Sequence, residues 1–143
     1  SLREASALEI AAAGPFIGTR NRWLSPASVD PTDADLYAVH TPHIGGVLQR
    51  YRAAGSGLIA ERVATGLTNH RIGTRDLDTT ARLGRWLLVP VQDWQQMAVV
   101  DLETMSVAGI VDVDAPILQL VTSSNRRSVA VLTRSGLSLY FPR

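Results

Sequence analysis

The chain has 143 residues, the length of one ordinary domain, of which 45% are hydrophobic and 19% are charged. These values lie in the range of globular proteins and exclude an intrinsically disordered chain. The formal net charge of +1 gives no broad attraction for nucleic acid, and no apolar run approaches the roughly 20 residues of a membrane helix. We therefore expect neither a nucleic-acid partner nor membrane insertion.

The chain contains no cysteine, which excludes disulfides, thiolate metal ligands and a cysteine nucleophile. Nor does it carry a Gly-x-Ser-x-Gly elbow or a glycine-rich phosphate loop followed by lysine. We predict no catalytic residue and no cofactor. The composition does not fix the compartment, with a periplasmic or extracellular location slightly favoured over a cytoplasmic one.

Short apolar segments separated by polar or glycine-containing turns follow one another along almost the whole chain. Many alternate apolar and polar residues with a period of two, which predicts antiparallel strands in a meander. In chain order we expect strands at residues 7–13, 20–29, 36–40, 47–52, 58–63, 69–78, 86–91, 97–102, 106–114, 117–121, 129–133 and 137–141.

These segments recur at a spacing of about 40–50 residues, which is typical of propeller blades with four short strands each. The repeating units are approximately residues 20–67, 68–115 and 116–143. The sequence therefore predicts an all-β fold of about three propeller-type four-stranded blades in a single domain. An antiparallel β-sandwich or barrel is the alternative.

One copy of the repeat carries a recognisable turn, in which Asp101 and Thr104 lie between the valine-rich segments 99–100 and 106–107. This stretch resembles the strand–turn–strand core of YVTN-type β-propeller repeats, where an Asp-x-x-Thr turn joins two such strands. The resemblance implies a propeller, and propellers of this kind mostly serve as rigid binding scaffolds. It constrains the chemistry very little.

The third unit has only three expected strands, and residues 7–13 precede the first complete unit. An N-terminal strand could therefore complete the last blade. Three blades fall short of the roughly four to eight that surround a closed channel. We predict that the chain does not close alone. Either two copies associate, with residues 7–13 of one pairing with residues 137–141 of the other, or the chain is part of a longer propeller.

The alternation in residues 106–114 predicts which of its side chains face the core. Val107, Val111 and Val113 are expected to be buried, while Asp112 and Asp114 are expected to be much more exposed.

Histidines and carboxylates supply the most specific candidate site. His40 and His43 stand three residues apart on a proline-containing turn, and His70, Asp76 or Asp78 could converge on them from the next unit. Such a set could line one end of a propeller channel. Because it lacks an HExxH-type context, surface histidines are the simpler interpretation, and we assign no metal.

Trp94 lies among Gln92, Asp93, Gln95 and Gln96 in a predicted polar turn. An exposed indole flanked by amides could contact a protein partner or stack on a sugar ring.

We therefore expect a non-catalytic binding or assembly module with a protein partner or a homo-oligomeric state. The alternatives are a portion of a propeller enzyme or redox protein with a metal or cofactor at the channel end, and a lectin-like module.

Overall fold

The structure is a computed structural model that describes residues 12–14, 23–29 and 34–142. These residues form eleven β-strands: β1 (Leu24–Val29), β2 (Asp35–His40), β3 (Val47–Ala54), β4 (Gly57–Thr65), β5 (Ala81–Leu83), β6 (Trp86–Pro90), β7 (Gln96–Asp101), β8 (Ser106–Asp112), β9 (Ile117–Thr122), β10 (Val129–Thr133) and β11 (Gly136–Tyr140). The described part of the chain contains no helix that could cross a membrane. The predicted all-β class is confirmed.

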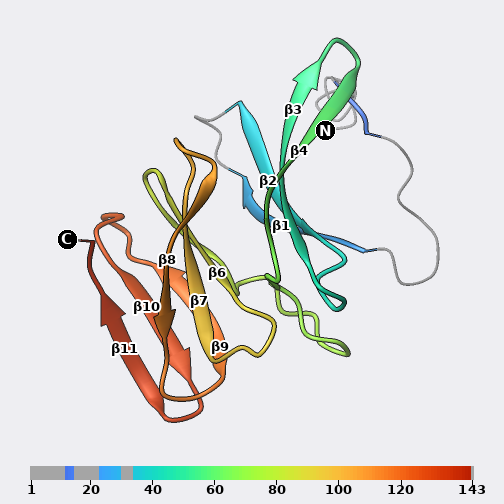
Figure 1. Cartoon of the computed structure of the whole chain (residues 1–143). Coiled ribbons are helices and arrows are strands. Elements are labelled where there is room, and N and C mark those ends of the chain that lie inside the picture. The colour runs from blue at the N-terminus through green and yellow to red at the C-terminus, as the bar shows by residue number, and fades with distance from the viewer. Residues whose placement is uncertain (1–11, 15–22, 30–33, 143) are drawn as a thin grey trace, which may run out of the picture.

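The strands form three separate sheets, each of which is an antiparallel meander of consecutive strands (Figure 1). Sheet 1 contains β1 to β4, sheet 2 contains β5 to β8, and sheet 3 contains β9 to β11. The first strands of the sheets lie side by side, since β5 contacts both β1 and β9. On the opposite side, β4 of sheet 1 contacts β8 of sheet 2. Sheet 3 has no corresponding fourth strand among the described residues.

Sheet 2 is covered on both faces, which explains why its central strands are almost continuously apolar. In β6, Leu87 and Val89 belong to a core shared with Tyr37 and Val39 of sheet 1. The intervening Leu88 packs instead in the core that sheet 2 shares with sheet 3. Adjacent residues of one strand point to opposite faces, so both neighbouring sheets are held by the same short segment. Burying each such leucine contributes roughly 1.5–3 kcal/mol.

The second core has the same construction. Met97 of β7 faces sheet 3, where it meets Leu120 of β9 and Val129 and Val131 of β10. The next residue, Ala98, faces sheet 1. Sheets 1, 2 and 3 are therefore stacked face to face in chain order.

The Asp-x-x-Thr turn closes the β7–β8 hairpin through its aspartate. The Asp101 carboxylate accepts a hydrogen bond from the backbone N–H of Glu103 at 2.9 Å and from Nε of Arg85 at 3.0 Å. The side-chain hydrogen bond from Arg85 holds the pKa of Asp101 below its usual value. The aspartate thus fixes the turn and links it to the neighbouring β5–β6 turn.

Three details of the sequence prediction are wrong or fall outside the described residues. The segment 69–78 was expected to be a strand, but residues 68–80 form a connection without strand and sheet 2 begins with the three residues of β5. The buried Asn69 in this connection donates side-chain hydrogen bonds to β1 of sheet 1, and no residue of the connection pairs in a strand. Of the expected closing strand at 7–13, residues 7–11 lie outside the described part, and Ala13 forms a parallel bridge with Gly57.

Val107 is not buried but 40% exposed. A bulge places Val107 and Val111 on opposite faces of the strand, because Val99 pairs with Gly109 whereas Val100 pairs with Val107. Val107 is exposed because β8 is the outer strand of sheet 2, and all but one of its residues are exposed. The prediction holds better beyond the bulge, where Val111 and Val113 are half-buried and Asp112 and Asp114 are exposed.

Candidate functional site

Two of the three histidines meet at one end of sheets 1 and 2. Nε2 of His43, in the turn between β2 and β3, lies 2.9 Å from Nδ1 of His70 in the connection to sheet 2. The Trp23 ring joins them, with its centroid 5.1 Å from that of His43 and 4.3 Å from that of His70. His70 is buried, whereas Trp23 is exposed. The three rings form what we call the histidine pocket.

Backbone contacts position the turn that carries His43. Thr41 adopts a positive φ of 50°, and its N–H donates to the carbonyl of Trp23 at 2.7 Å. The Gln92 side chain donates to the carbonyls of Pro42 at 2.9 Å and Leu67 at 2.7 Å. One amide from sheet 2 therefore joins the two segments that carry the histidines.

The connection around His70 is fixed by its buried neighbours. The Asn69 side chain donates to the carbonyls of Ser25 at 3.1 Å and Pro26 at 2.8 Å in β1. The backbone carbonyl of Asn69 accepts a hydrogen bond from the Thr79 hydroxyl at 2.5 Å. These hydrogen bonds tie the connection to β1 and to its own later residues, although the side-chain Oδ1 atom of Asn69 is buried without a partner among the described residues.

The surroundings of His43 favour its uncharged form. Burial, and then the nearby His70, lower the pKa of His43 below its usual value of 6.5. At 2.9 Å one imidazole can donate to the other only while the acceptor nitrogen carries no proton. Burial therefore favours the neutral form of His43.

We expect acidification below about pH 6.5 to weaken the fold through this pair. The pKa of His43 is lower in the folded state than in the unfolded state, so the unfolded chain binds the proton more readily. Stability is therefore lost as the pH falls from about 6.5 toward the lower pKa of the folded state. Urea unfolding between pH 8 and pH 5.5 should show a declining free energy of unfolding, and His43→Gln should flatten the decline. An equal slope in the variant would contradict this role.

The other histidine and both carboxylates stay away from the pocket. His40 is the last residue of β2, and its Nε2 atom is buried without a hydrogen-bond partner in the described structure. Asp76 lies 4.0 Å from Arg71, and Asp78 accepts a hydrogen bond from Gln119. No group of three or more His, Asp or Glu residues able to hold a metal ion occurs among the described residues.

Trp94 is less exposed than its polar surroundings suggested. The ring is half-buried and packs against the core between sheets 2 and 3, while the Arg71 guanidinium lies 4.0 Å from its centroid. Trp94 also has a positive φ of 63°, and its carbonyl accepts a hydrogen bond from the Ile117 N–H at 2.8 Å. The indole therefore links the sheets, and one of its faces already holds a cation.

Nothing in the sequence indicates that Trp23 contacts two histidines. Trp23 stands just before β1 and is distant in the sequence from both His43 and His70. Only the docking of three separate turns brings these rings together.

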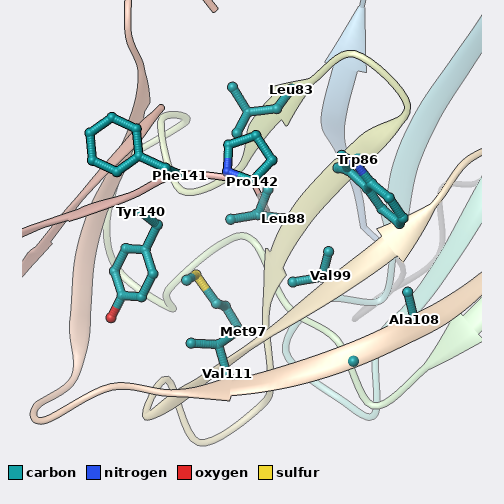
Figure 2. A pocket seen from close by; sticks show the side chains of 11 residues that line it. Leu83, Trp86, Leu88, Met97, Val99, Ala108, Val111, Tyr140, Phe141 and Pro142 are labelled. Atoms are coloured by element: carbon teal, nitrogen blue, oxygen red, sulfur yellow. The ribbon is translucent and has the colours of Figure 1, made fainter. Parts of the chain in front are cut away.

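The structure also contains an apolar pocket of about 350 Å³ between sheets 2 and 3. Sheet 2 lines it with Leu83, Trp86, Leu88, Met97, Val99, Ala108, Gly109 and Val111, and the end of sheet 3 lines it with Tyr140, Phe141 and Pro142. Figure 2 shows the rings of Tyr140 and Phe141 across the pocket from Trp86 and Ala108, with Met97 and Val99 between. We call this feature the apolar cleft. No lining residue is charged.

The face of sheet 3 that points away from sheet 2 is also apolar. Val121 of β9, Leu132 of β10, and Leu137 and Leu139 of β11 are exposed there, by 46%, 37%, 67% and 60%. The register places Val121 and Leu139 on either side of Ala130, and Leu137 opposite Leu132. Since Val129 and Val131 face sheet 2, these alternate residues form one continuous outer surface. We call it the outer face of sheet 3.

Comparison with known proteins yields little. No protein-family model matches the chain, and no curated protein matches it. Among solved structures, Kluyveromyces lactis Hsv2 is similar over 83% of this chain and 33% of its own, with a TM-score of 0.47 and 12% sequence identity. A form described as "KlHsv2 with loop 6CD replaced by a Gly-Ser linker" gives a TM-score of 0.45, 10% identity, and coverage of 83% and 36%. The chain spans about a third of the length of these solved chains.

Proposed function

We propose that the chain is a non-catalytic binding and assembly module built from three propeller-type blades, with sheets 1, 2 and 3 as the blades. The observation that carries the proposal is the outer face of sheet 3, whose four exposed apolar side chains form one surface. Contiguous exposed apolar surface of this kind marks interaction sites. Each blade of this chain already buries such a face against its neighbour, so the interface would extend an existing mode of packing.

The occupant that we propose for this face is sheet 1 of a second copy. The outward side of sheet 1 carries the cross-strand pair Leu36 and Tyr51, on the opposite face from the buried Tyr37 and Val39. Two copies joined reciprocally, outer face of sheet 3 to outward side of sheet 1, would hold six blades. That number lies within the roughly four to eight blades of closed propellers, and the arrangement has two-fold symmetry.

The alternatives find less support in the site. An enzyme or redox protein would need more than the histidine pocket, where two imidazoles lie at hydrogen-bonding distance and the expected carboxylates are engaged elsewhere. A lectin-like module loses its premise, because the Trp94 ring is half-buried and stacked by Arg71. Metal analysis of the purified protein remains a direct check, since stoichiometric metal would favour the enzyme alternative.

The mass in solution tests the proposed assembly. We expect light scattering at tens of micromolar to give about twice the 15.4 kDa of one chain, and Leu132→Asp to give a single chain, because a carboxylate on the outer face cannot be buried unpaired. Leu137→Asp, at a more exposed position on the same face, should behave alike. Leu77→Asp, at a residue 70% exposed in the connection between sheets 1 and 2, is the matched control.

A wild-type protein that stays at 15.4 kDa at these concentrations contradicts the proposal. So does a folded Leu132→Asp variant that associates as the wild type does. Circular dichroism of each variant confirms that its strands are intact before the masses are compared.

A further inference from the structure

The fourth-strand position of sheet 3 differs from that of the other two sheets. In sheets 1 and 2 the third strand pairs with a fourth, β4 on β3 and β8 on β7, each antiparallel. In sheet 3 the third strand, β11, pairs with β10 alone within the described residues. Its outer edge therefore presents backbone N–H and C=O groups that no described strand satisfies.

The apolar cleft lies beside this edge. Between sheets 1 and 2 the fourth strands contact each other, because β4 lies beside β8. On the other side of sheet 2, Val99, Ala108 and Val111 face sheet 3 but line the cleft instead of packing on a fourth strand. Tyr140, at the end of β11, closes the cleft from sheet 3. Within the described part of the chain, the edge of β11 that no strand pairs with thus adjoins an apolar surface that no strand covers.

We infer that β11 and the apolar cleft bind an extended polypeptide segment, which adds to sheet 3 as an antiparallel fourth strand and places alternate apolar side chains in the cleft. The inference rests on the proposed binding function and names a site for it. Strand addition draws affinity from main-chain hydrogen bonds and selectivity from pockets for alternate side chains. The uncharged lining selects apolar side chains, and about 350 Å³ lies within the range of pockets that take specific ligands.

The chain itself supplies a template for the ligand. In sheet 2 the fourth strand, β8, directs Val107 and Ile110 toward sheet 1, since they pair with Val100 and Ala98 of that core. A strand in the fourth position of sheet 3 would direct the equivalent residues toward sheet 2 and into the cleft. A peptide with the sequence of residues 106–114 is therefore a rational probe.

Fluorescence anisotropy with this labelled peptide tests the inference on the full chain. We expect saturable binding with a Kd on the order of 10–100 µM, and a loss of about tenfold or more when Val107 and Ile110 of the peptide are both aspartate. A peptide N-methylated at alternate residues keeps its side chains but has no backbone N–H donors along one of its two edges. Two such peptides can be made, one for each edge, and the one that lacks the donors facing β11 should bind at least about tenfold more weakly than the parent peptide.

Variants of the protein locate the site. Ala108→Glu should weaken peptide binding about tenfold by placing a charge in the cleft, while Ile110→Glu, on the opposite face of β8, should leave it unchanged. Both positions are exposed on an outer strand, so both variants are expected to fold.

The inference would be overturned by no binding of the peptide, by equal binding of both N-methylated registers and the parent peptide, or by equal weakening by Ala108→Glu and Ile110→Glu. If the peptide instead separates two associated copies of the chain, then a second copy occupies the apolar cleft in solution, and this result would also overturn the inference. The proposed assembly is tested separately by Leu132→Asp, which lies on the other face of sheet 3. A failure at the cleft is therefore distinguishable from a failure of the assembly.

Discussion

Alanine in place of Leu87, or of Leu88 in a second variant, is expected to lower the free energy of unfolding by about 2–5 kcal/mol in each case. The two residues are adjacent in β6 and point to opposite faces of sheet 2. Leu87 is fully buried against sheet 1, and Leu88 is buried against sheet 3. Each substitution removes apolar contacts and leaves a cavity that the packed sheets on either side cannot fill easily.

Urea unfolding of the two variants and of Leu132→Ala measures this effect. Leu132 lies on the outer face of sheet 3, so its truncation removes much less buried surface within one chain. A large loss for only one of Leu87 and Leu88 would indicate a strand with one solvated face, as in an ordinary sandwich. That result would contradict the stacking of three sheets.

Alanine in place of Gly46 is expected to cost about 2 kcal/mol or more. A Cβ atom at this position would lie 1.9 Å from the carbonyl oxygen of Leu67 and 2.9 Å from Cγ1 of Val39. The first contact is with backbone, and the N–H of Leu67 donates to the carbonyl of Gly46 at 3.2 Å. The strands cannot move apart without breaking this link between the turn before β3 and the end of sheet 1.

Gly109→Ala is the matched control for Gly46→Ala. A Cβ atom at Gly109 would meet nothing within 4 Å, and the substitution removes backbone freedom from the unfolded chain. We expect a change of less than about 1 kcal/mol, in the stabilising direction. Thermal unfolding followed by circular dichroism compares the two variants. Equal stability for both would show that Leu67 does not approach Gly46 as described.

The strands were predictable because their periodicity is local. Segments such as 97–102 and 129–133 combine β-branched residues with polar turns, and the structure places β7 and β10 there. The bulge between Val99 and Val100 was not predicted, although Gly109, which pairs with Val99, is a residue type that often marks a bulge inside a strand. The first strand of sheet 2 was placed too early because the repeat spacing, and not an alternation of residues, predicted a strand at 69–78, whereas β5 begins at Ala81.

The candidate site was less predictable than the fold. The spacing of His40 and His43 suggested a pair, yet His43 pairs with His70, 27 residues away, because the turn after β2 docks on the connection to sheet 2. The cleft could not be read from the sequence at all. It lies where the described residues supply no fourth strand to sheet 3, and its lining comes from four strands of sheet 2 and the end of sheet 3.

Single cysteines introduced into this cysteine-free chain test most directly whether sheet 2 is packed between two other sheets. Met97→Cys and Ala98→Cys place thiols at adjacent, fully buried positions facing sheets 3 and 1, and Leu77→Cys is an exposed reference. We expect both buried thiols to react with a maleimide at least roughly a thousandfold more slowly than the reference, because labelling requires unfolding. A thiol at either position that reacts as fast as the one at Leu77 would contradict this packing.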